Sequence, residues 1–248
     1  MRIDVVFGGA ALTPAEVVGR VVAVIDVLRA STSIAVALAN GARAIIPVET
    51  PDEVVMRAKA LARNDVLLAG ERKMMPIPGF DLGNSPIEFT PAMVDGKTIL
   101  LTTTNGTPAI AGTGGARDVL IASYVNYTAV LTMLRAALRG GADITLVCAG
   151  RDRQFALEDA GCAGRFVTNV SKRLVGITMN DAAQTCALVD RKYGDQIVRL
   201  FEASEHGRAL RDAGFDADLM ACAAIDSHPV IPLYQDRQIT KLGPDRER

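Results

Sequence analysis

Apolar β-branched runs alternate with Ala-rich stretches as far as Leu174, and this alternation most constrains what the chain can fold into. Short apolar runs of this kind are typical of parallel strands that are buried on both faces. Strands are predicted at 21–25, 44–48, 66–69, 98–101, 119–122 and 144–148, and helices at 31–39, 51–62, 127–138 and 158–174. Thr50, followed by Pro51, is the predicted N-cap of the second helix. This order predicts a three-layer α/β/α fold with a mostly parallel or mixed central sheet.

The sequence after Leu174 is richer in helix, with helices predicted at 180–192, 196–202 and 218–225. No Ser/Gly linker or run of charge separates this part from the alternating part. We therefore expect residues 1–248 to form a single α/β domain. The helix-rich part, about 175–230, is expected to pack on that same domain.

Composition excludes several classes of protein. Hydrophobic residues make up 49% of the 248 residues and charged residues 22%, which is typical of a globular protein. A net charge of -1 and the absence of Trp leave little for nucleic acid to bind, so no nucleic-acid partner is expected. No apolar run is long enough to span a bilayer, and MRIDVVFGG lacks the apolar core of a secretory signal. We expect no membrane partner, and we allow for a homodimer.

The four cysteines are widely spaced and lie among small apolar residues, at Cys148, Cys162, Cys186 and Cys222. Such thiols are most often small buried hydrophobes. With only two histidines and no CxxC pair, the chain offers no zinc motif. A reducing, cytoplasmic location is expected.

The segment 70–86, GERKMMPIPGFDLGNSP, follows a predicted strand and is too rich in Pro and Gly to continue as strand or helix. In open α/β sheets, ligands bind outside the carboxyl ends of the strands. The segment supplies polar side chains suited to binding, namely Glu71, Arg72, Lys73, Asp81, Asn84 and Ser85. It is therefore predicted to be a binding loop.

A second strand end begins at Asp26 and continues through Arg29, Ser31 and Thr32 into a predicted helix. A helix N-terminus with hydroxyl groups suits an anion, and Arg29 can add a charge-assisted fork. The same residues are also those of an ordinary helix cap, and local spacing does not separate the two interpretations.

Two further strand ends carry polar residues. The segment 102–107, TTTNGT, combines a tight turn with hydroxyl and amide groups that can hold phosphate. After the strand at 144–148 come Arg151 and Asp152, and then Glu158 and Asp159 at a helix start. If all these strand ends open on one crevice, its carboxylates and hydroxyls favour oxygen-bound Mg²⁺.

Several catalytic motifs are absent. The chain has no GxxxxGK[ST], no GxSxG and no complete dinucleotide fingerprint, and Asp26-Val27-Leu28 is not the DxD of haloacid-dehalogenase-like phosphatases. Metal-assisted hydrolysis and anion binding remain open.

The blocks DVLRASTSI at 26–34, GERxxxxIPGFDLGNSP at 70–86, TTTNGT at 102–107, and CAG with EDxxxAG at 148–164 resemble the 2-phosphosulfolactate phosphatase family. The resemblance extends over nearly the whole chain. It implies Mg²⁺-dependent hydrolysis of 2-phospho-3-sulfolactate to 3-sulfolactate and phosphate, a step associated with coenzyme M biosynthesis. The alternatives are a phosphatase for another small phosphorylated hydroxy acid and a non-catalytic binder of a phosphorylated or sulfonated anion.

The residues in these blocks give the expected site. The expected catalytic residues are Asp26, Arg29, Glu71 and Asp81. The expected substrate-binding residues are Arg29, Ser31, Thr32, Arg72, Asn84, Ser85, Thr104, Asn105, Gly106 and Arg151. The carboxylates expected to hold Mg²⁺ are Asp26, Glu158 and Asp159.

Two roles follow from position. Arg29 precedes a hydroxyl-rich helix start and is assigned to the phosphate, whereas Arg72 lies in the loop and is assigned to the carboxylate or sulfonate. Either water activated by the metal or a carboxylate such as Asp26 can attack phosphorus, and the sequence does not separate these routes.

Overall fold

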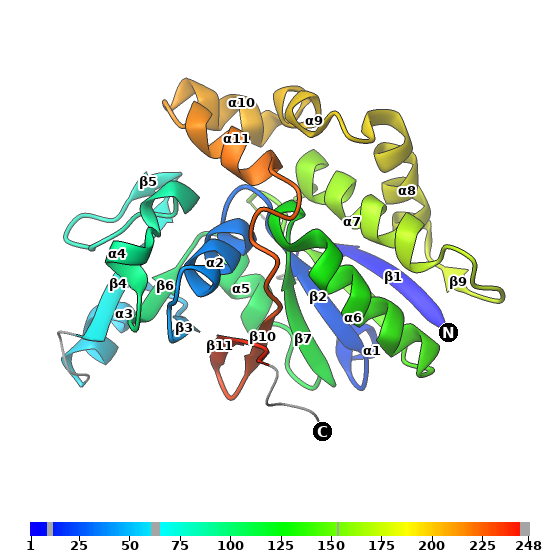
Figure 1. Cartoon of the computed structure of the whole chain (residues 1–248), viewed down its shortest axis with the longest axis horizontal. Coiled ribbons are helices and arrows are strands. Elements are labelled where there is room, and N and C mark those ends of the chain that lie inside the picture. Colours follow the sequence, from blue (N-terminus) through cyan, green and yellow to red (C-terminus); the bar gives the residue numbers. More distant parts are fainter. Residues whose placement is uncertain (9–11, 61–64, 153, 244–248) are drawn as a thin grey trace.

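One mixed sheet runs through the molecule, with helices on both of its faces (Figure 1). The computed structural model describes residues 1–8, 12–60, 65–152 and 154–243. Within these residues eleven strands lie in the order β5-β4-β6-β3-β11-β10-β7-β2-β8-β1-β9. Their bounds are β1 Arg2–Phe7, β2 Val21–Ile25, β3 Ala44–Pro47, β4 Val66–Arg72, β5 Met75–Pro76, β6 Thr98–Thr102, β7 Asp118–Ala122, β8 Ile144–Cys148, β9 Thr178–Met179, β10 Pro232–Gln235 and β11 Gln238–Lys241. The three-layer α/β/α fold with a mixed sheet is confirmed.

The helices are distributed over both faces of this sheet. Their bounds are α1 Pro14–Val17, α2 Ala30–Ala39, α3 Pro51–Lys59, α4 Pro91–Val94, α5 Gly106–Ala111, α6 Tyr127–Arg139, α7 Leu157–Val170, α8 Asp181–Tyr193, α9 Ile197–Ala203, α10 Glu205–Asp212 and α11 Asp216–Ala223. Alternate residues of β2 show the two faces: Ala23 packs in the core with α6 and α7, while Val22 and Val24 pack in the core with α2 and α5.

The six predicted strands are all present, because each is an apolar run buried inside the sheet. β2 and β8 have the predicted bounds, and they pair with each other in parallel register, for example Ile25 with Cys148. Thr50 is confirmed as an N-cap, since its hydroxyl accepts a hydrogen bond from the N–H of Glu53 at 3.2 Å. The predicted end of that helix, at 62, lies outside the described residues.

Most predicted boundaries that fall on described residues differ from the structure by at most two residues, and two are wrong by more than that. α7 ends at Val170 and not at 174. Ser171 forms its C-cap, and the Ser171 hydroxyl donates a hydrogen bond to the carbonyl of Val167. β4 continues to Arg72, so the first three residues of the predicted loop are strand, and β5 pairs with them in an antiparallel turn. β6 holds the extension in place by pairing Gly70 with Thr102.

A hairpin that the sequence analysis did not predict occupies the middle of the sheet. β10 pairs antiparallel with β7, β11 pairs antiparallel with β3, and the two strands pair with each other. The hairpin thus joins the half of the sheet that contains β4, β6 and β3 to the half that contains β7, β2 and β8. β1, β9 and α10 were also not predicted.

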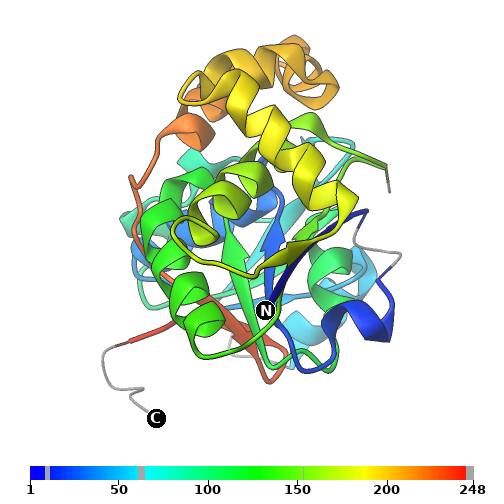
Figure 2. The ribbon, with the colours of Figure 1, turned by 90° about the vertical axis from the view of Figure 1, so that its right-hand side faces the viewer.

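The last helices gather at one end of the molecule. Figures 1 and 2 both place α9, α10 and α11 together at the top of the view, beyond the end of the sheet. They share one apolar core with the sheet: Leu200, Leu210 and Leu219 belong to the same cluster as Ile25 and Leu146. This arrangement brings the start of α10 close to the carboxyl ends of the central strands.

The expectation of buried thiols is confirmed, because all four cysteines are free and buried. Burial raises the pKa of Cys148 and of Cys162 well above the usual value, and that of Cys222 to about 12. These thiols therefore act as apolar packing groups. Among the described helices, none combines the length and the apolar character that a bilayer crossing requires.

Candidate functional site

A pocket of about 340 Å³ lies where the carboxyl ends of β2, β4, β6 and β8 meet. Residues at the ends of these strands and in the loops that follow them line it, together with one residue of α10; they are Asp26, Leu28, Arg29, Glu71, Lys73, Met74, Asn84, Thr104, Asn105, Arg151, Asp152 and His206. The structure thus brings all four predicted strand ends to one cavity. A larger cavity, of about 670 Å³, lies at the other end of β2 and β7, near Val21 and Asp118, and contains none of the predicted site residues.

Asp26 is the most strongly perturbed carboxylate in this pocket. Its carboxylate accepts a hydrogen bond from the N–H of Ala30 at 3.3 Å, at the start of α2, and its own N–H donates to the hydroxyl of Ser31 at 2.9 Å. Burial raises the pKa of Asp26 to about 6; Glu71 and Glu158 also raise it, while His206 lowers it. A carboxylate with this pKa changes protonation close to neutral pH, as acid–base and nucleophilic groups do.

Gly106 makes room for the Asp26 carboxylate. A Cβ at position 106 would lie 2.7 Å from Oδ2 of Asp26 and 2.6 Å from Cβ of Ala30. No side chain larger than hydrogen fits between these atoms. Gly106 is therefore a spacer between the loop after β6 and the start of α2.

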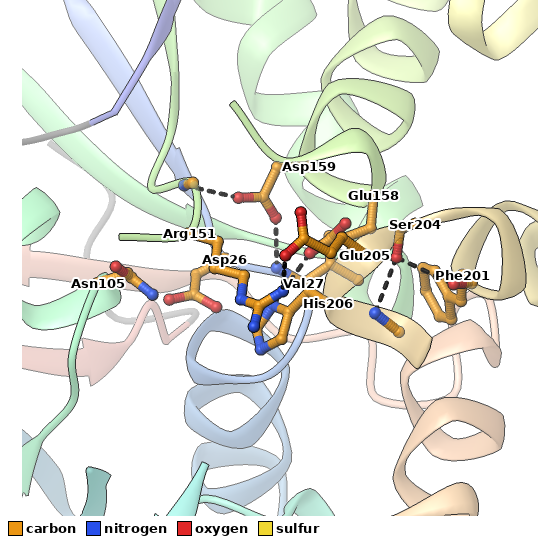
Figure 3. A network of polar contacts seen from close by, with 12 residues as sticks. Asp26, Val27, Asn105, Arg151, Glu158, Asp159, Phe201, Ser204, Glu205 and His206 are labelled. Atoms are coloured by element: carbon orange, nitrogen blue, oxygen red, sulfur yellow. Dashed lines mark hydrogen bonds and ion pairs between the residues drawn. The ribbon is translucent and has the colours of Figure 1, made fainter. Parts of the chain in front are cut away.

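Asp159 and Glu158 are both buried at the start of α7, but they have different partners (Figure 3). The two carboxylate oxygens of Asp159 accept hydrogen bonds from the N–H groups of Val27, at 2.9 Å, and Gly150, at 3.0 Å. Burial raises the pKa of Asp159 well above its usual range, and the charges of Asp26 and Glu158 add to this rise. Asp159 therefore ties the loop after β2 to the loop after β8.

Glu158 contacts His206 of α10, with Oε1 at 3.1 Å from Nδ1 of the imidazole. Its other oxygen, Oε2, is buried and has no hydrogen-bond partner among the described residues. Glu158 does not line the 340 Å³ pocket itself, and it reaches the pocket through His206.

Arg29 lines the pocket and is almost fully enclosed by protein. Its guanidinium forms an ion pair with Asp218 at 2.7 Å, donates to the carbonyl of Met74 at 2.6 Å and lies over the ring of Phe215 at 4.3 Å. The other carboxylate oxygen of Asp218 accepts a hydrogen bond from the hydroxyl of Ser85 at 2.5 Å. Arg29 therefore has a fixed orientation.

Glu71 connects two loops of the pocket. Oε1 accepts from the N–H of Thr104 at 2.7 Å, and Oε2 accepts from the N–H of Met74 at 2.9 Å. Both oxygens are therefore engaged, and the position fits a residue that shapes the pocket. A direct catalytic role for Glu71 stays a prediction.

Two predicted residues of the 70–86 segment lie away from the pocket. The guanidinium of Arg72 donates to the carbonyls of Glu71 and Glu49 and to the hydroxyl of Thr102. Asp81 accepts from the N–H of Leu68 at 2.8 Å, which fixes the loop to β4. The geometry does not favour the assignment of Arg72 to the far anion or of Asp81 to catalysis, because neither side chain lines the cavity.

The predicted hydroxyl groups are also used within the protein. Thr32 donates to the carbonyl of Val27 at 2.9 Å and hydrogen-bonds to Ser123, while Ser31 donates to the carbonyl of Val24. Neither hydroxyl caps α2, because the N-cap is Arg29 and no side chain accepts a cap bond there, and neither hydroxyl lines the pocket. Among the predicted binding residues, the pocket does receive Asn84, Thr104 and Asn105, and Oδ1 of Asn84 is buried without a hydrogen-bond partner among the described residues.

The sequence analysis did not assign four residues that the structure places in or beside the site. Lys73 and Asp152 line the pocket, and both have positive φ values, of 51° and 50°. His206 comes from the unpredicted α10, and Asp218 pairs with Arg29 across 189 positions of sequence. Lys73 was visible in the loop as a cation, whereas no local signal indicated His206 or Asp218.

The expected Mg²⁺ ligands fit only in part. Within the described ranges, no three His, Cys, Asp or Glu side chains come close enough together to enclose a metal ion. Asp159 does not fit, because both of its oxygens already accept backbone hydrogen bonds. Proteins often hold Mg²⁺ with only one or two carboxylates, and water and substrate phosphate complete the octahedron. Asp26 in the pocket and the free Oε2 of Glu158 fit that kind of site.

Fold and pocket together define an α/β protein with a pocket, lined by carboxylates and cations, at the carboxyl ends of its strands, the place where open α/β sheets bind small molecules. The family model described as 2-phosphosulpholactate phosphatase matches residues 10–237. The chain belongs to this family, and the resemblance seen in its motifs is confirmed.

Relatives from several bacteria match over most of their length, and each is named "Probable 2-phosphosulfolactate phosphatase". The protein of Symbiobacterium thermophilum is 40% identical over 227 residues, which cover 92% of this chain and 96% of the relative. That of Clostridium botulinum is 35% identical over 242 residues, covering 98% of this chain and 100% of the relative. That of Thermotoga petrophila is 38% identical over 213 residues, covering 86% and 88%.

Proposed function

We propose that this protein hydrolyses 2-phospho-3-sulfolactate to 3-sulfolactate and phosphate with the help of Mg²⁺. One observation carries the proposal: in a small pocket, a buried carboxylate with a raised pKa, Asp26, faces the same cavity as the cations Arg29 and Lys73. Phosphoryl transfer needs positive groups around the phosphoryl oxygens and a carboxylate at the reacting centre. The names of the relatives supply the substrate.

The described residues suggest a separate role for each charged side chain in the pocket. Arg29, held rigid by Asp218, is suited to the phosphoryl oxygens, since a fixed fork loses little entropy when it binds. Lys73 is exposed at the turn between β4 and β5 and adds a second positive charge. Asp26 either attacks phosphorus or takes the proton of an attacking water, and both roles need its deprotonated form.

Magnesium would withdraw negative charge from the phosphoryl oxygens when it is bound. Asp26 is the residue we propose to hold it, with Glu158 as the second carboxylate. The requirement for the metal is a prediction, which removal of the ion from the assay tests.

The test is a phosphate-release assay with purified protein, Mg²⁺ and a panel of short phosphorylated hydroxy acids that includes 2-phospho-3-sulfolactate. We expect turnover that stops with EDTA and returns with added Mg²⁺. Asp26→Asn should lower kcat by at least about 100-fold, because it removes the reacting carboxylate. Asp195→Asn is the matched control, since the Asp195 side chain is 84% exposed and pairs with Arg165.

Three outcomes would change the proposal. Phosphate release from a different phosphorylated hydroxy acid at a much higher kcat/KM would replace the substrate. Tight binding of the ester without any turnover would favour a non-catalytic anion binder. Full activity in Asp26→Asn would remove Asp26 from the reaction.

A further inference from the structure

Arg151 lies at the border between the pocket and a second cavity. This second cavity has a volume of about 460 Å³ and lies between the starts of α7 and α10. Arg151, Asp152 and His206 line both cavities. A ligand that fills the pocket therefore meets Arg151 at the side where the cavity continues.

The ion pair between Arg151 and Glu205 is weak. Nη1 of Arg151 contacts Oε1 of Glu205 at 2.9 Å, and the Glu205 side chain is 82% exposed (Figure 3). An exposed ion pair of this kind contributes little to stability, because water competes for both charges. Asp152 is the other carboxylate near the Arg151 guanidinium, and it lies farther from it, at 3.9 Å from Nε. Arg151 can therefore exchange its partner at small cost.

The position of Glu205 is fixed by the start of α10. Ser204 caps this helix by accepting a hydrogen bond from the N–H of Gly207 at 2.9 Å and donating to the carbonyl of Phe201 at 2.9 Å. A Cβ at Gly207 would clash with that same carbonyl, so the helix start packs closely on α9. Glu205 is thus presented to Arg151 by a rigid element.

The other arginines near the pocket cannot exchange their present partners for a substrate anion at small cost. Arg29 is enclosed by Asp218, Met74 and Phe215, and Arg72 is engaged by backbone carbonyls and Thr102. Resting on the proposed function, we propose that Arg151 binds the second anionic group of the substrate, a carboxylate or sulfonate, and that Glu205 holds Arg151 until this anion replaces it.

If the substrate anion replaces Glu205 at Arg151, substitutions of these two residues should change KM in opposite directions. Arg151→Gln should raise KM for substrates that carry a second anion by about tenfold to a hundredfold, since a charge-assisted fork is lost. Glu205→Gln should lower KM for the same substrates by about twofold to fivefold, because the competing charge is gone. In the double variant, Glu205→Gln should have no further effect.

Three substrates separate the subsite from the phosphate. Phenyl phosphate has no second anion, 2-phospholactate adds a carboxylate, and 2-phospho-3-sulfolactate adds a carboxylate and a sulfonate. We expect KM for phenyl phosphate to change by less than about twofold in every variant. An effect already present with 2-phospholactate identifies the carboxylate, and one seen only with 2-phospho-3-sulfolactate identifies the sulfonate.

Glu202→Gln is the matched control. Glu202 lies in α9, its side chain is 46% exposed and it pairs with Arg211 in the same kind of surface ion pair. Its removal changes the net charge by the same amount, and we expect no change in KM. If Glu202→Gln lowered KM as much as Glu205→Gln does, the effect would be one of net charge and the inference would be wrong. An equal rise of KM for all three substrates in Arg151→Gln would also overturn it.

Calorimetry with 3-sulfolactate gives a readout that does not need turnover. This ligand carries both distal anions and no phosphate, and it should bind more weakly to Arg151→Gln and more tightly to Glu205→Gln. If the wild-type protein released no phosphate from any substrate, these titrations would still decide the role of Arg151. Unchanged binding in both variants, with unchanged melting temperatures, would refute it.

Discussion

The buried carboxylate of Asp26 makes the folded protein less stable than it would be with a neutral group at this position. Burial raises its pKa to about 6, above the usual value of 3.8, so the folded state holds the proton more tightly than the unfolded state does. The contribution of Asp26 to the free energy of unfolding is therefore fully present below the unfolded pKa, where the carboxyl group is protonated in both states. It is lost as the pH rises through about 6 and the buried group becomes charged.

Asp26→Asn should accordingly stabilise the protein above this range while it abolishes activity. In the presence of EDTA, the gain at pH 8 is expected to be of order 1–3 kcal/mol and to vanish towards pH 4. Urea unfolding at a series of pH values measures it. A variant that is destabilised equally at every pH would mean that the bond to Ala30, and not the charge, governs the contribution of Asp26.

Individual site residues differ in how far the sequence could predict them. Asp26 directly follows a buried strand, and Arg29 and Asn105 lie in the loops that follow such strands, so their place at the strand ends could be predicted. His206 and Asp218 could not be, because each reaches the site from a C-terminal helix whose docking is decided by tertiary packing. A buried Arg29 requires an acidic partner, but nothing in the local sequence shows which carboxylate it will be.

At the scale of elements, helices α7 and α8 form the most extensive contact between any two elements of the described chain. Gly164 makes this contact possible. A Cβ at this position would clash with the backbone carbonyl of Cys186 in α8. Because the obstacle is backbone, it cannot move aside by a change of rotamer.

Gly164→Ala should therefore lower the free energy of unfolding by about 1–3 kcal/mol, even though Ala is the better helix former. Thermal or urea denaturation measures the effect. Gly114→Ala is the control, since a Cβ there meets no atom within 4 Å and its stability should change by less than about 0.5 kcal/mol. Equal stability of the two variants would show that α8 shifts to accommodate the methyl group.

The β10–β11 hairpin, β1 and α10 were not predicted from the sequence, and they share a physical reason. The turn of the β10–β11 hairpin places Asp236 and Arg237 at φ values of 52° and 62°, although neither is the Gly or Asn that usually marks such a turn. β1 includes charged residues, and Asp4 accepts hydrogen bonds from both Arg2 and Arg20. In α10 the polar residues outnumber the apolar ones. Apolar periodicity predicts elements that have an apolar face of their own to bury. The hairpin, β1 and α10 depend instead on contacts with residues far away in the sequence.

At the scale of the whole molecule, the β10–β11 hairpin provides the only strand pairing that joins the two halves of the described sheet. Ile239 of β11 is fully buried and lies opposite Ile45 of β3. Ile239→Ala should lower the free energy of unfolding by about 2–5 kcal/mol, because it leaves a cavity where the halves meet.

Gln238→Ala, at an exposed position of the same strand, is the control, with an expected change below about 0.5 kcal/mol. Both variants can be compared by urea unfolding with fluorescence and circular dichroism as probes. A single shared transition in Ile239→Ala supports one cooperative sheet. If the two probes reported separate transitions, the halves of the sheet would unfold independently and the hairpin would not couple them.

The position of this hairpin in the chain also constrains how the protein can be made on the ribosome. All other strands of the described sheet lie before Asn180, whereas β10 begins at Pro232. Until Pro232–Lys241 has emerged, β3 and β7 of a nascent chain present unpaired edges, which are the surfaces on which partly folded chains aggregate. The sheet therefore cannot be completed before residues 232–241 have emerged, and a nascent chain shorter than this is expected to aggregate more readily than the folded protein.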